Sequence, residues 1–343
     1  MKSLRRSMIA AAAMIAAAAM IAGCRGSGTG TMLGPDGSTD SSGDDSAITV
    51  PQVTEYAPYF YTWGWGAHSY AFSSLVEMKS KGGPSAVTLA FVLSNNGTCD
   101  VTTEIQHNLD DVHAFIAAGG HVRASFGGAF GTYLENACPS SEALAEAISR
   151  FVDATQITDL DFDIEQGTTS SNSSINAMRG RALARVQAAK GIRVSLTLPV
   201  APSGLVLTGR NVVQAVLDAG VTVSYVNGMT MDYGNATDLG VVPNQSVDAT
   251  AAQVGTMFGI SLEQAYRKVG VTPMIGHNDD TSVFSLANAH ALIDHASQHK
   301  VGLVSFWAIQ RDQSCTSGLN EDTCNGAASS TFAFHQIFEA ANP

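Results

Sequence analysis

The segment Asp159-Leu-Asp-Phe-Asp-Ile-Glu165 alternates carboxylic acids with bulky apolar side chains. Successive side chains of a β-strand point to opposite faces. A strand here therefore places Asp161, Asp163 and Glu165 on one face and the apolar residues on the other. Because the apolar residues are bulky, we expect their face to pack against helices. The sequence thus predicts a buried strand that carries a row of acids on its inner face.

Further strand-like runs lie on both sides of this segment, and helical runs separate them. The expected strands cover residues 53–63, 85–93, 121–126, 159–164, 192–198, 223–231, 272–275 and 302–307. The expected helices cover residues 110–118, 141–154, 175–189, 212–219, 251–268 and 286–299. Strands that alternate with helices form parallel βαβ units, and eight of them predict an α/β fold of the (β/α)8 TIM-barrel type. The alternative is a doubly wound open sheet, but no glycine-rich phosphate-binding sequence follows the first strand.

The composition excludes some classes of function. Of 343 residues, 45% are hydrophobic, and 30 acidic against 18 basic residues give a formal charge of −12. An acidic chain is poorly suited to binding nucleic acid, because phosphate backbones require a basic surface. The apolar fraction is too high for a largely disordered chain. We therefore expect a folded domain that does not bind nucleic acid.

The N-terminus has the pattern of an export signal. Three basic residues precede an apolar run over residues 8–21, which is typical of a secretory signal peptide. Ile21-Ala-Gly-Cys24 resembles a bacterial lipobox, in which the cysteine is lipidated. We therefore expect a lipoprotein signal peptide over residues 1–23, acyl chains on Cys24 that hold the protein to a membrane, and a flexible Gly/Ser/Asp-rich tether over residues 24–50. The expected location is a bacterial membrane surface, which is the outer membrane or cell surface in a Gram-negative cell, or the medium after release.

The four cysteines after Cys24 suggest two disulfides, since an even number is typical of exported chains. Among the possible pairings we favour Cys99–Cys138 with Cys315–Cys324, because the last two close a short polar loop. Zinc coordination is the alternative, but it requires a tight Cys/His spacing that these cysteines lack. We expect neither a metal nor a cofactor.

The row of acids predicts the chemistry. Carboxylates this close together cannot all ionise readily in a poorly solvated space, so at least one retains its proton near neutral pH. A protonated carboxylic acid in a sugar-sized cleft can protonate a leaving group. The alternatives are a solvated acidic edge strand, which the bulky apolar neighbours disfavour, and a hard-cation site, which a linear arrangement fits poorly.

The pattern Asp161-x-Asp163-x-Glu165 on a fourth barrel strand resembles the signature of glycoside hydrolase family 18, the chitinases and their relatives. Other strand ends are similar to motifs of that family: Ser125-Phe-Gly-Gly128, Met229-Thr-Met-Asp-Tyr-Gly234, Thr272 to Asp279 and Phe306 to Asp312. The resemblance spans about residues 53–340. It identifies residues 51–343 as a catalytic barrel similar to family 18 enzymes.

Two positions depart from the family pattern. Thr158-Asp-Leu160 stands where the family has Asp-Gly-x, although Asp159 is close enough in sequence to compensate in part. Met231-Asp-Tyr233 replaces the usual order of Tyr followed by Asp, so Tyr233 would have to act from a neighbouring position.

The resemblance implies a retaining mechanism in which the 2-acetamido group of the substrate is the nucleophile. Glu165 would protonate the glycosidic oxygen and then act as the base that activates water. Asp163 would orient the acetamido group, and Asp161 would share a proton with Asp163. Tyr233 or Asp232 would hold the acetamido group or the sugar.

Further residues are expected to contact substrate. Trp307 would form an apolar floor under an N-acetylglucosamine ring. Tyr59, Tyr61, Trp63 and Trp65 alternate in sequence and would share one face, where they line glycan subsites or cover the rim of the barrel. The full set of expected substrate contacts is Trp307, Ser125, Gly127, Gly128, Met229, Asn278, Tyr61 and Trp63.

The function implied by this resemblance is a chitinase that cleaves β-1,4-linked N-acetylglucosamine chains. Its expected partners are chitin or chitooligosaccharides and, through the lipid on Cys24, a membrane, and the protein is expected to be a monomer. One alternative is an endo-β-N-acetylglucosaminidase that acts on N-glycans by the same chemistry. The other is a non-catalytic glycan-binding lipoprotein, which loss of an acid would indicate, but all three acids are present.

Overall fold

The computed structural model describes residues 51, 53–101, 103–234, 237–316, 318–319 and 322–341. The expected signal peptide over residues 1–23, the lipidated Cys24 and the tether over residues 24–50 lie outside the described residues. Within the described part of the chain, none of the helices has the length and apolar composition that crossing a bilayer requires.

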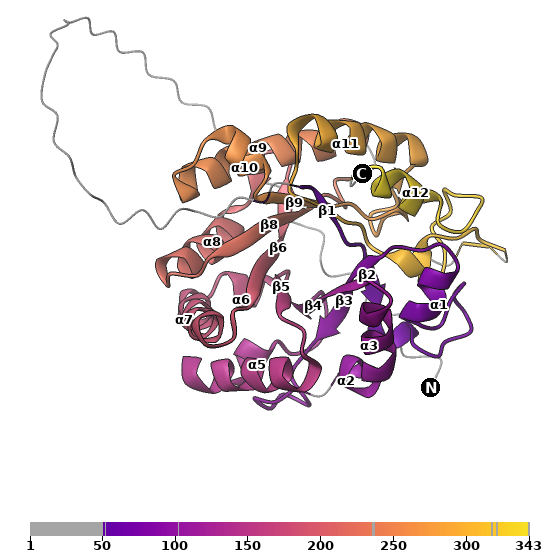
Figure 1. Cartoon of the computed structure of the whole chain (residues 1–343). Coiled ribbons are helices and arrows are strands. Elements are labelled where there is room, and N and C mark those ends of the chain that lie inside the picture. Colours follow the sequence, from indigo (N-terminus) through magenta and orange to yellow (C-terminus); the bar gives the residue numbers. More distant parts are fainter. Residues whose placement is uncertain are drawn as a thin grey trace, which may run out of the picture. The chain divides into compact units, whose positions relative to one another are not determined.

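A ring of parallel strands closes on itself through its first strand, which is in two pieces (Figure 1). β1 (Glu55–Tyr56) pairs with β12 (Leu303–Val304), and β2 (Tyr59–Tyr61) pairs with β3 (Ala86–Val92). The remaining strands follow in the order β4 (His121–Gly127), β5 (Asp159–Asp163), β6 (Arg193–Ala201), β8 (Val223–Met229) and β9 (Val269–Thr272). This arrangement confirms the predicted (β/α)8 barrel.

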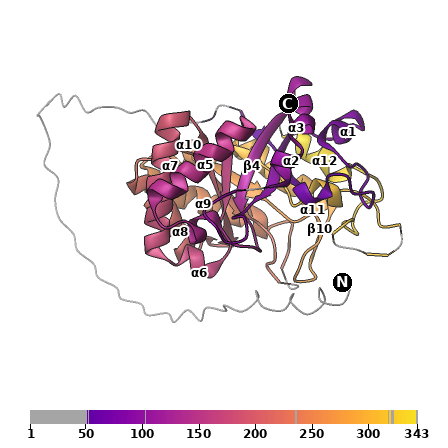
Figure 2. The ribbon, with the colours of Figure 1, turned by 90° about the horizontal axis from the view of Figure 1, so that it is seen from below.

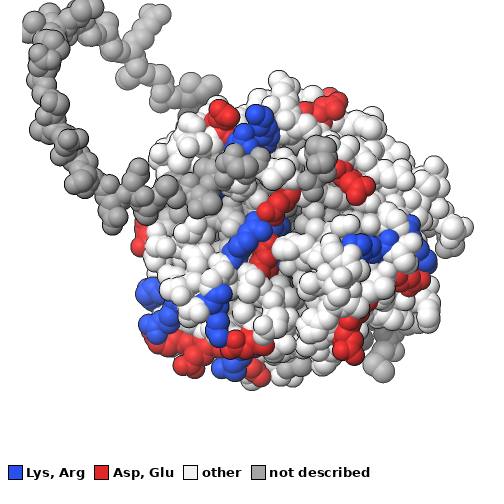
Figure 3. Space-filling model, in the orientation of Figure 1, with Lys and Arg blue, Asp and Glu red and all other residues white. Residues whose placement is uncertain are grey.

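Helices lie outside the ring of strands (Figures 1 and 2). They are α1 (Leu75–Ser80), α2 (Glu104–His107), α3 (Leu109–Ala117), α4 (Leu134–Ala137), α5 (Ser141–Thr155), α6 (Gly167–Ser170), α7 (Ser173–Lys190), α8 (Leu207–Asp218), α9 (Val242–Phe258), α10 (Leu262–Tyr266), α11 (Leu286–His299) and α12 (Ala333–Glu339). Short elements complete the fold: η1 (Thr62–Gly64), β7 (Gly204–Leu205), β10 (Gly276–His277), β11 (Val283–Phe284) and η2 (Ile309–Arg311). On the face shown in Figure 3, acidic and basic side chains are interspersed.

Several predicted elements have other bounds in the structure, and three of them differ for a local reason or in length. The helix expected over residues 251–268 is two helices, because Gly259 ends α9 in the left-handed region (φ +66°) and Ser261 caps a new helix, α10. The strand expected over residues 272–275 lies earlier, in β9, because Pro273 follows it and cannot donate a ladder hydrogen bond. The last strand, β12, is shorter than expected.

The alternation in β5 has the predicted consequence for packing. All residues of β5 are buried. Phe162 points outward and stacks on Phe126 of β4 with ring centroids 5.1 Å apart, and Phe126 contacts Phe151 of α5 edge-on. The acids of β5 therefore face the interior of the barrel.

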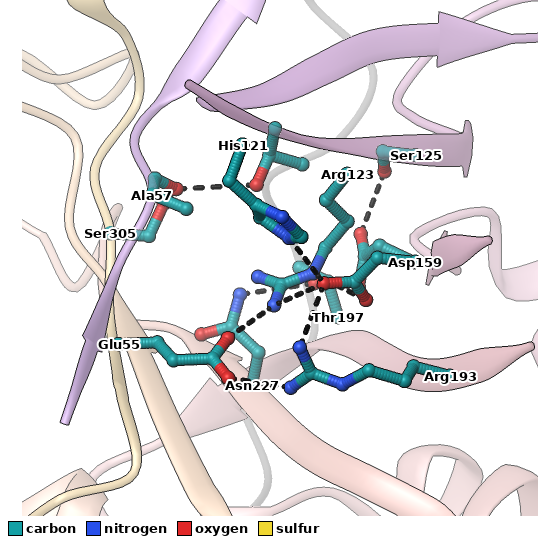
Figure 4. A network of polar contacts seen from close by, with 12 residues as sticks. Glu55, Ala57, His121, Arg123, Ser125, Asp159, Arg193, Thr197, Asn227 and Ser305 are labelled. Atoms are coloured by element: carbon teal, nitrogen blue, oxygen red, sulfur yellow. Dashed lines mark hydrogen bonds and ion pairs between the residues drawn. The ribbon is translucent and has the colours of Figure 1, made fainter. Parts of the chain in front are cut away.

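An ion-pair network fills the interior at the N-terminal ends of the strands (Figure 4). Arg123 donates to Asp159 at 3.1 Å and to Glu55 at 2.9 Å, and Arg193 donates to the same two acids at 3.2 and 2.6 Å. Burial raises the pKa of Asp159, but the Arg123 charge, a hydrogen bond from His121 and the Arg193 charge outweigh burial and lower it overall. Asp159 is therefore an ionised structural residue and does not replace the missing family aspartate.

Both predicted disulfides are present. Cys99 is bonded to Cys138, with their Cα atoms 4.5 Å apart, and Cys315 is bonded to Cys324, with Cα atoms 5.3 Å apart. The first bridge joins the loop after β3 to the end of α4, and the second closes a loop after η2.

Candidate active site

Strand pairing brings the acids together with polar residues of the neighbouring strands. In the parallel register, Asp161 lies opposite Ser125 of β4 and Ser195 of β6, and Asp163 lies opposite Gly127. Asp161 and Asp163 are buried within β5, and Glu165 follows the end of the strand and is partly buried. The three acids thus rise along one line toward the C-terminal ends of the strands.

Three hydroxyl groups donate hydrogen bonds to Asp161. Ser125 donates at 2.7 Å, Thr197 at 2.8 Å and Tyr59 at 3.1 Å. Burial raises the pKa of Asp161, and these hydroxyl groups oppose the rise. Ser125 is fully buried. The structure therefore places it beneath the acids, whereas the sequence had suggested contact with a substrate.

Asp163 and Glu165 share a hydrogen bond, and their pKa values are both raised. Burial, followed by the charges of Glu165 and Asp161, raises the pKa of Asp163 well above its ordinary value. Burial also raises the pKa of Glu165, to about 7, although the hydrogen bond with Asp163 lowers it. Both carboxyl groups therefore keep their protons to a higher pH than isolated carboxyl groups do, and the pKa of Glu165 lies close to neutrality.

The backbone of the β4 loop approaches Asp163 closely. Gly127 has φ +112°, and a Cβ atom on it would lie 2.0 Å from the carbonyl oxygen of Asp163. The Gly128 amide donates to that same oxygen at 3.0 Å. A Cβ atom on Gly128 would lie 2.6 Å from the ring of Phe91. Glycine is therefore required at both positions. These two residues of the motif Ser125-Phe-Gly-Gly128 support the strand end that carries Asp163.

Tyr133 supports Glu165 from the same loop. The amide of Glu165 donates to the Tyr133 hydroxyl group at 3.0 Å, and that hydroxyl group donates to the carbonyl oxygen of Gly128 at 2.7 Å. Tyr133 is buried. The sequence analysis did not identify Tyr133, because it lies in a loop without a local motif and its contacts are made to a distant strand end.

Aromatic rings gather next to the acids. Trp307 is partly exposed, stacks on Phe91 with centroids 5.6 Å apart, and contacts Tyr61 at 4.9 Å. Trp63 has 52% of its surface exposed and stacks on Tyr61 with centroids 4.5 Å apart. Tyr61 is itself only 2% exposed, so it supports the two tryptophans and, contrary to our expectation, offers little surface to a sugar. Phe91 was not identified from the sequence.

The expected alternation of aromatic residues ends before Trp65. The 3-10 helix η1 interrupts the extended chain after Tyr61. As a result the Trp65 indole turns toward the outer helices and donates to Asp111 of α3 at 2.7 Å.

The residues that follow β8 lie differently from the expectation. Tyr233 turns outward, and its hydroxyl group is hydrogen-bonded to Ser246 of α9 at 2.8 Å. Asp232 is exposed, has φ +58° and accepts from the amide of Asp279 at 2.9 Å. Although the residue is exposed, partial loss of solvent around its carboxyl group and the charges of Asp279 and Asp280 raise its pKa to about 6. Of the two candidates for the acetamido-binding role, Asp232 is the one whose charge reaches Glu165.

Asn278 and Met229 are largely enclosed. Asn278 is 2% exposed, its amide donates to the carbonyl oxygens of Met274 and Gly276, and its oxygen accepts from the Asp232 amide. It therefore braces the loop that presents Asp232, instead of contacting substrate directly. Met229, at the end of β8, is 9% exposed.

Within the described residues, one set of His, Cys, Asp or Glu side chains lies close enough together to share a metal ion. It consists of Asp248, His295 and His299 and is located on the outer helices, away from the acids of β5.

Comparisons with known proteins agree with this geometry. No protein-family model matches the chain. Endochitinase 11 of Metarhizium anisopliae is 33% identical over 246 residues, which are 66% of this chain and 47% of that protein. A protein of Escherichia coli K12 named "Probable bifunctional chitinase/lysozyme" is 30% identical over 281 residues, which are 72% of this chain and 31% of that protein. The chain thus spans less than half the length of either curated relative.

Solved structures match over nearly the whole barrel. Active domain 2 of a chitinase from Pyrococcus furiosus superposes with a TM-score of 0.75 at 30% identity, covering 85% of this chain and 96% of that domain. The same domain has been solved as catalytic-site mutants in complex with chito-oligosaccharides. An endo-β-N-acetylglucosaminidase from Cordyceps militaris shares the fold, with a TM-score of 0.50 at 17% identity.

Proposed function

Since the chain belongs to the chitinase family of glycoside hydrolases, family 18, we propose that it hydrolyses β-1,4-linked N-acetylglucosamine chains with retention of configuration. The observation that carries the proposal is the pair of neighbouring carboxyl groups of Asp163 and Glu165, whose pKa values are both raised by burial. A general acid works best when its pKa is close to the working pH, because it must both give up and regain a proton. The pKa of about 7 for Glu165 meets this requirement.

In the first step, Glu165 transfers its proton to the glycosidic oxygen while the bond from that oxygen to the anomeric carbon breaks. The acetamido oxygen of the same sugar attacks the anomeric carbon and forms a cyclic oxazolinium species, so no second enzyme carboxylate is needed as nucleophile. In the second step, the Glu165 carboxylate removes a proton from water, which attacks the same carbon and reopens the ring. The two inversions give net retention.

Asp163 is suited to hold the acetamido group. Its Oδ1 atom is buried and has no hydrogen-bond partner among the described residues. A buried polar atom without a partner is unfavourable, and an incoming N–H donor would satisfy it. We assign the acetamido N–H of the substrate to this position. Asp161, fixed by its three hydroxyl donors, would share its proton with Asp163 as the pair ionises.

Trp307 and Trp63 are the aromatic surfaces available to sugar rings. Both rest on Tyr61, and Trp307 also rests on Phe91, so their orientation is fixed before a ligand binds. We propose that Trp307 forms the floor beneath the sugar at the cleavage point and that Trp63 contacts a neighbouring sugar.

The test is hydrolysis of chitooligosaccharides by the wild type, by Glu165→Gln and by Glu146→Gln. Glu146 is an exposed residue of α5 and serves as the matched control. We expect the wild type and Glu146→Gln to be equally active and Glu165→Gln to lose activity. Equal rates for all three would refute the mechanism. Release of N-glycans from a glycoprotein, without cleavage of chitooligosaccharides, would replace the chitinase proposal by the endo-β-N-acetylglucosaminidase alternative.

We also propose that the protein is exported and held to a bacterial membrane by lipid on Cys24, with residues 24–50 as a tether for a monomeric catalytic domain. The lipobox-like sequence before Cys24 supports this. Labelling of bacterial cultures with a radioactive fatty acid should mark the wild type and not Cys24→Ser. Label in both proteins, or in neither, would refute lipid attachment at Cys24, and sedimentation of the released domain would test the monomer.

A further inference from the structure

Two neighbouring outer helices bring together a group of side chains that the hydrolytic mechanism does not use. α9 and α11 lie side by side: the Asn244 amide donates to the carbonyl oxygen of Ala291, and one turn further on Asp248 meets His295. α10 follows α9 and adds Tyr266 to the same place (Figure 1).

The side chains at this place have the identity and spacing of metal ligands. His295 and His299 are separated by four residues, so they project from one face of α11. Paired histidines with this spacing on a helix are a recurring zinc-binding arrangement. Asp248 supplies a carboxylate from α9, which completes a set of two imidazoles and one carboxylate. Transition metals such as Zn²⁺ favour this ligand set.

The distances are close to those that a shared ion requires. Asp248 Oδ1 lies 2.8 Å from His295 Nε2, and the three potential ligand atoms lie within 4.8 Å of one another. Bonds of roughly 2.0–2.1 Å to a tetrahedral zinc ion would place the ligand atoms roughly 3.4 Å apart. Small side-chain rotations would therefore bring all three atoms onto one ion.

A simple His295–Asp248 ion pair does not account for the third residue. The ring of His299 lies 4.5 Å from that of His295 between centroids, yet no described residue forms a hydrogen bond with either of its ring nitrogens. Tyr266 packs on His299 at 4.6 Å and donates to Asp248 Oδ1 at 2.8 Å. This hydrogen bond holds the carboxylate in the orientation that a metal ligand needs, as outer partners of metal sites commonly do.

Water can reach the site from one side. His299 and Tyr266 line a hollow of about 380 Å³. Three protein ligands with solvent access leave the fourth coordination position to water. We propose that Asp248, His295 and His299 bind one divalent transition-metal ion of the zinc class and thereby link α9 to α11.

The first experiment is calorimetric titration of ZnCl2 into the full chain without a polyhistidine tag. We expect one ion to bind per chain, and His299→Ala to weaken the binding at least tenfold. His290→Ala is the matched control, because His290 is exposed on the same helix but lies outside the cluster. Absence of binding to the wild type, or equal affinity in His299→Ala, would overturn the proposal.

Two further variants separate this site from the catalytic one and from a purely structural contact. Glu165→Gln should bind zinc as the wild type does, and loss of zinc binding in it would place the metal at the catalytic acids instead. Tyr266→Phe keeps the ring but loses the hydrogen bond to Asp248, and we expect a loss of affinity of roughly tenfold. In thermal unfolding, ZnCl2 should raise the midpoint of the wild type and of His290→Ala but not that of His295→Ala, whereas CaCl2 should raise none of them.

Discussion

Replacement of Gly127 by alanine should inactivate the enzyme through a single backbone contact. The new Cβ atom would lie 2.0 Å from the carbonyl oxygen of Asp163, whereas real Cβ contacts essentially never fall below 3.0 Å. One of the two strand ends must therefore move by about 1 Å, and displacement of a catalytic group by that distance costs about 100-fold in rate. We expect kcat on chitooligosaccharides to fall by about that factor in Gly127→Ala.

The control separates the collision from the cost of backbone conformation. Gly220 also has a positive φ, +82°, but a Cβ atom there would meet no atom within 4 Å. Both alanine variants should lose about 1–3 kcal/mol of stability from the strained conformation, measured by denaturant unfolding. Only Gly127→Ala should also lose activity under conditions where both variants are folded. A folded Gly127→Ala variant with wild-type kcat would refute the argument that this contact positions Asp163.

Three other predictions follow from the geometry of the barrel. The first step of the proposed mechanism needs protonated Glu165, whose pKa is raised to about 7, so kcat/KM in a pH–rate series should fall as the pH rises through about 7. A profile level to pH 9 would contradict the assignment. Tyr133→Phe removes a buried hydroxyl group bonded to the Glu165 amide and should cost about 1–3 kcal/mol in denaturant unfolding and lower kcat, and unchanged values of both would show that this support is dispensable. Arg123→Met leaves Asp159 with fewer cationic partners in a buried place and should cost about 3–5 kcal/mol at neutral pH. Because the folded-state pKa of Asp159 is lowered, the stability that this residue contributes is present above its unfolded pKa and is lost in acid. The difference in free energy of unfolding between wild type and Arg123→Met, measured in urea, should therefore narrow as the pH falls below about 4. A difference that does not change with pH would refute this account.

The inward row of acids could be predicted from sequence because it depends only on strand alternation. Asp161 and Asp163 lie within β5, so their direction follows from their position in the strand. The same rule failed for Tyr233, because β8 ends at Met229 and the positive φ of Asp232 redirects the chain toward α9. It failed for Trp65 too, where η1 replaces the strand.

Contacts between distant loops could not be predicted in this way. Tyr133 touches Glu165 only because β4 and β5 are neighbours in the folded barrel. The spacing of His295 and His299 is visible in the sequence, but their carboxylate partner, Asp248, comes from another helix. Sequence patterns identify groups that share one element, whereas groups assembled from several elements require the fold.

The divided first strand sets the order in which the protein can be completed during synthesis. Among the described strands, β1 pairs only with β12, the last strand of the barrel, while β2 pairs with the early strand β3. On a growing chain, β2 can dock as soon as β3 has been made, but β1 has to wait until nearly the whole domain has been synthesised. Glu55 lies in β1, so Arg123 and Arg193 of the internal ion network lack this acid until β1 has paired with β12. The barrel therefore cannot close before β12 has been synthesised, and until then β1 has no strand beside it to complete the ring.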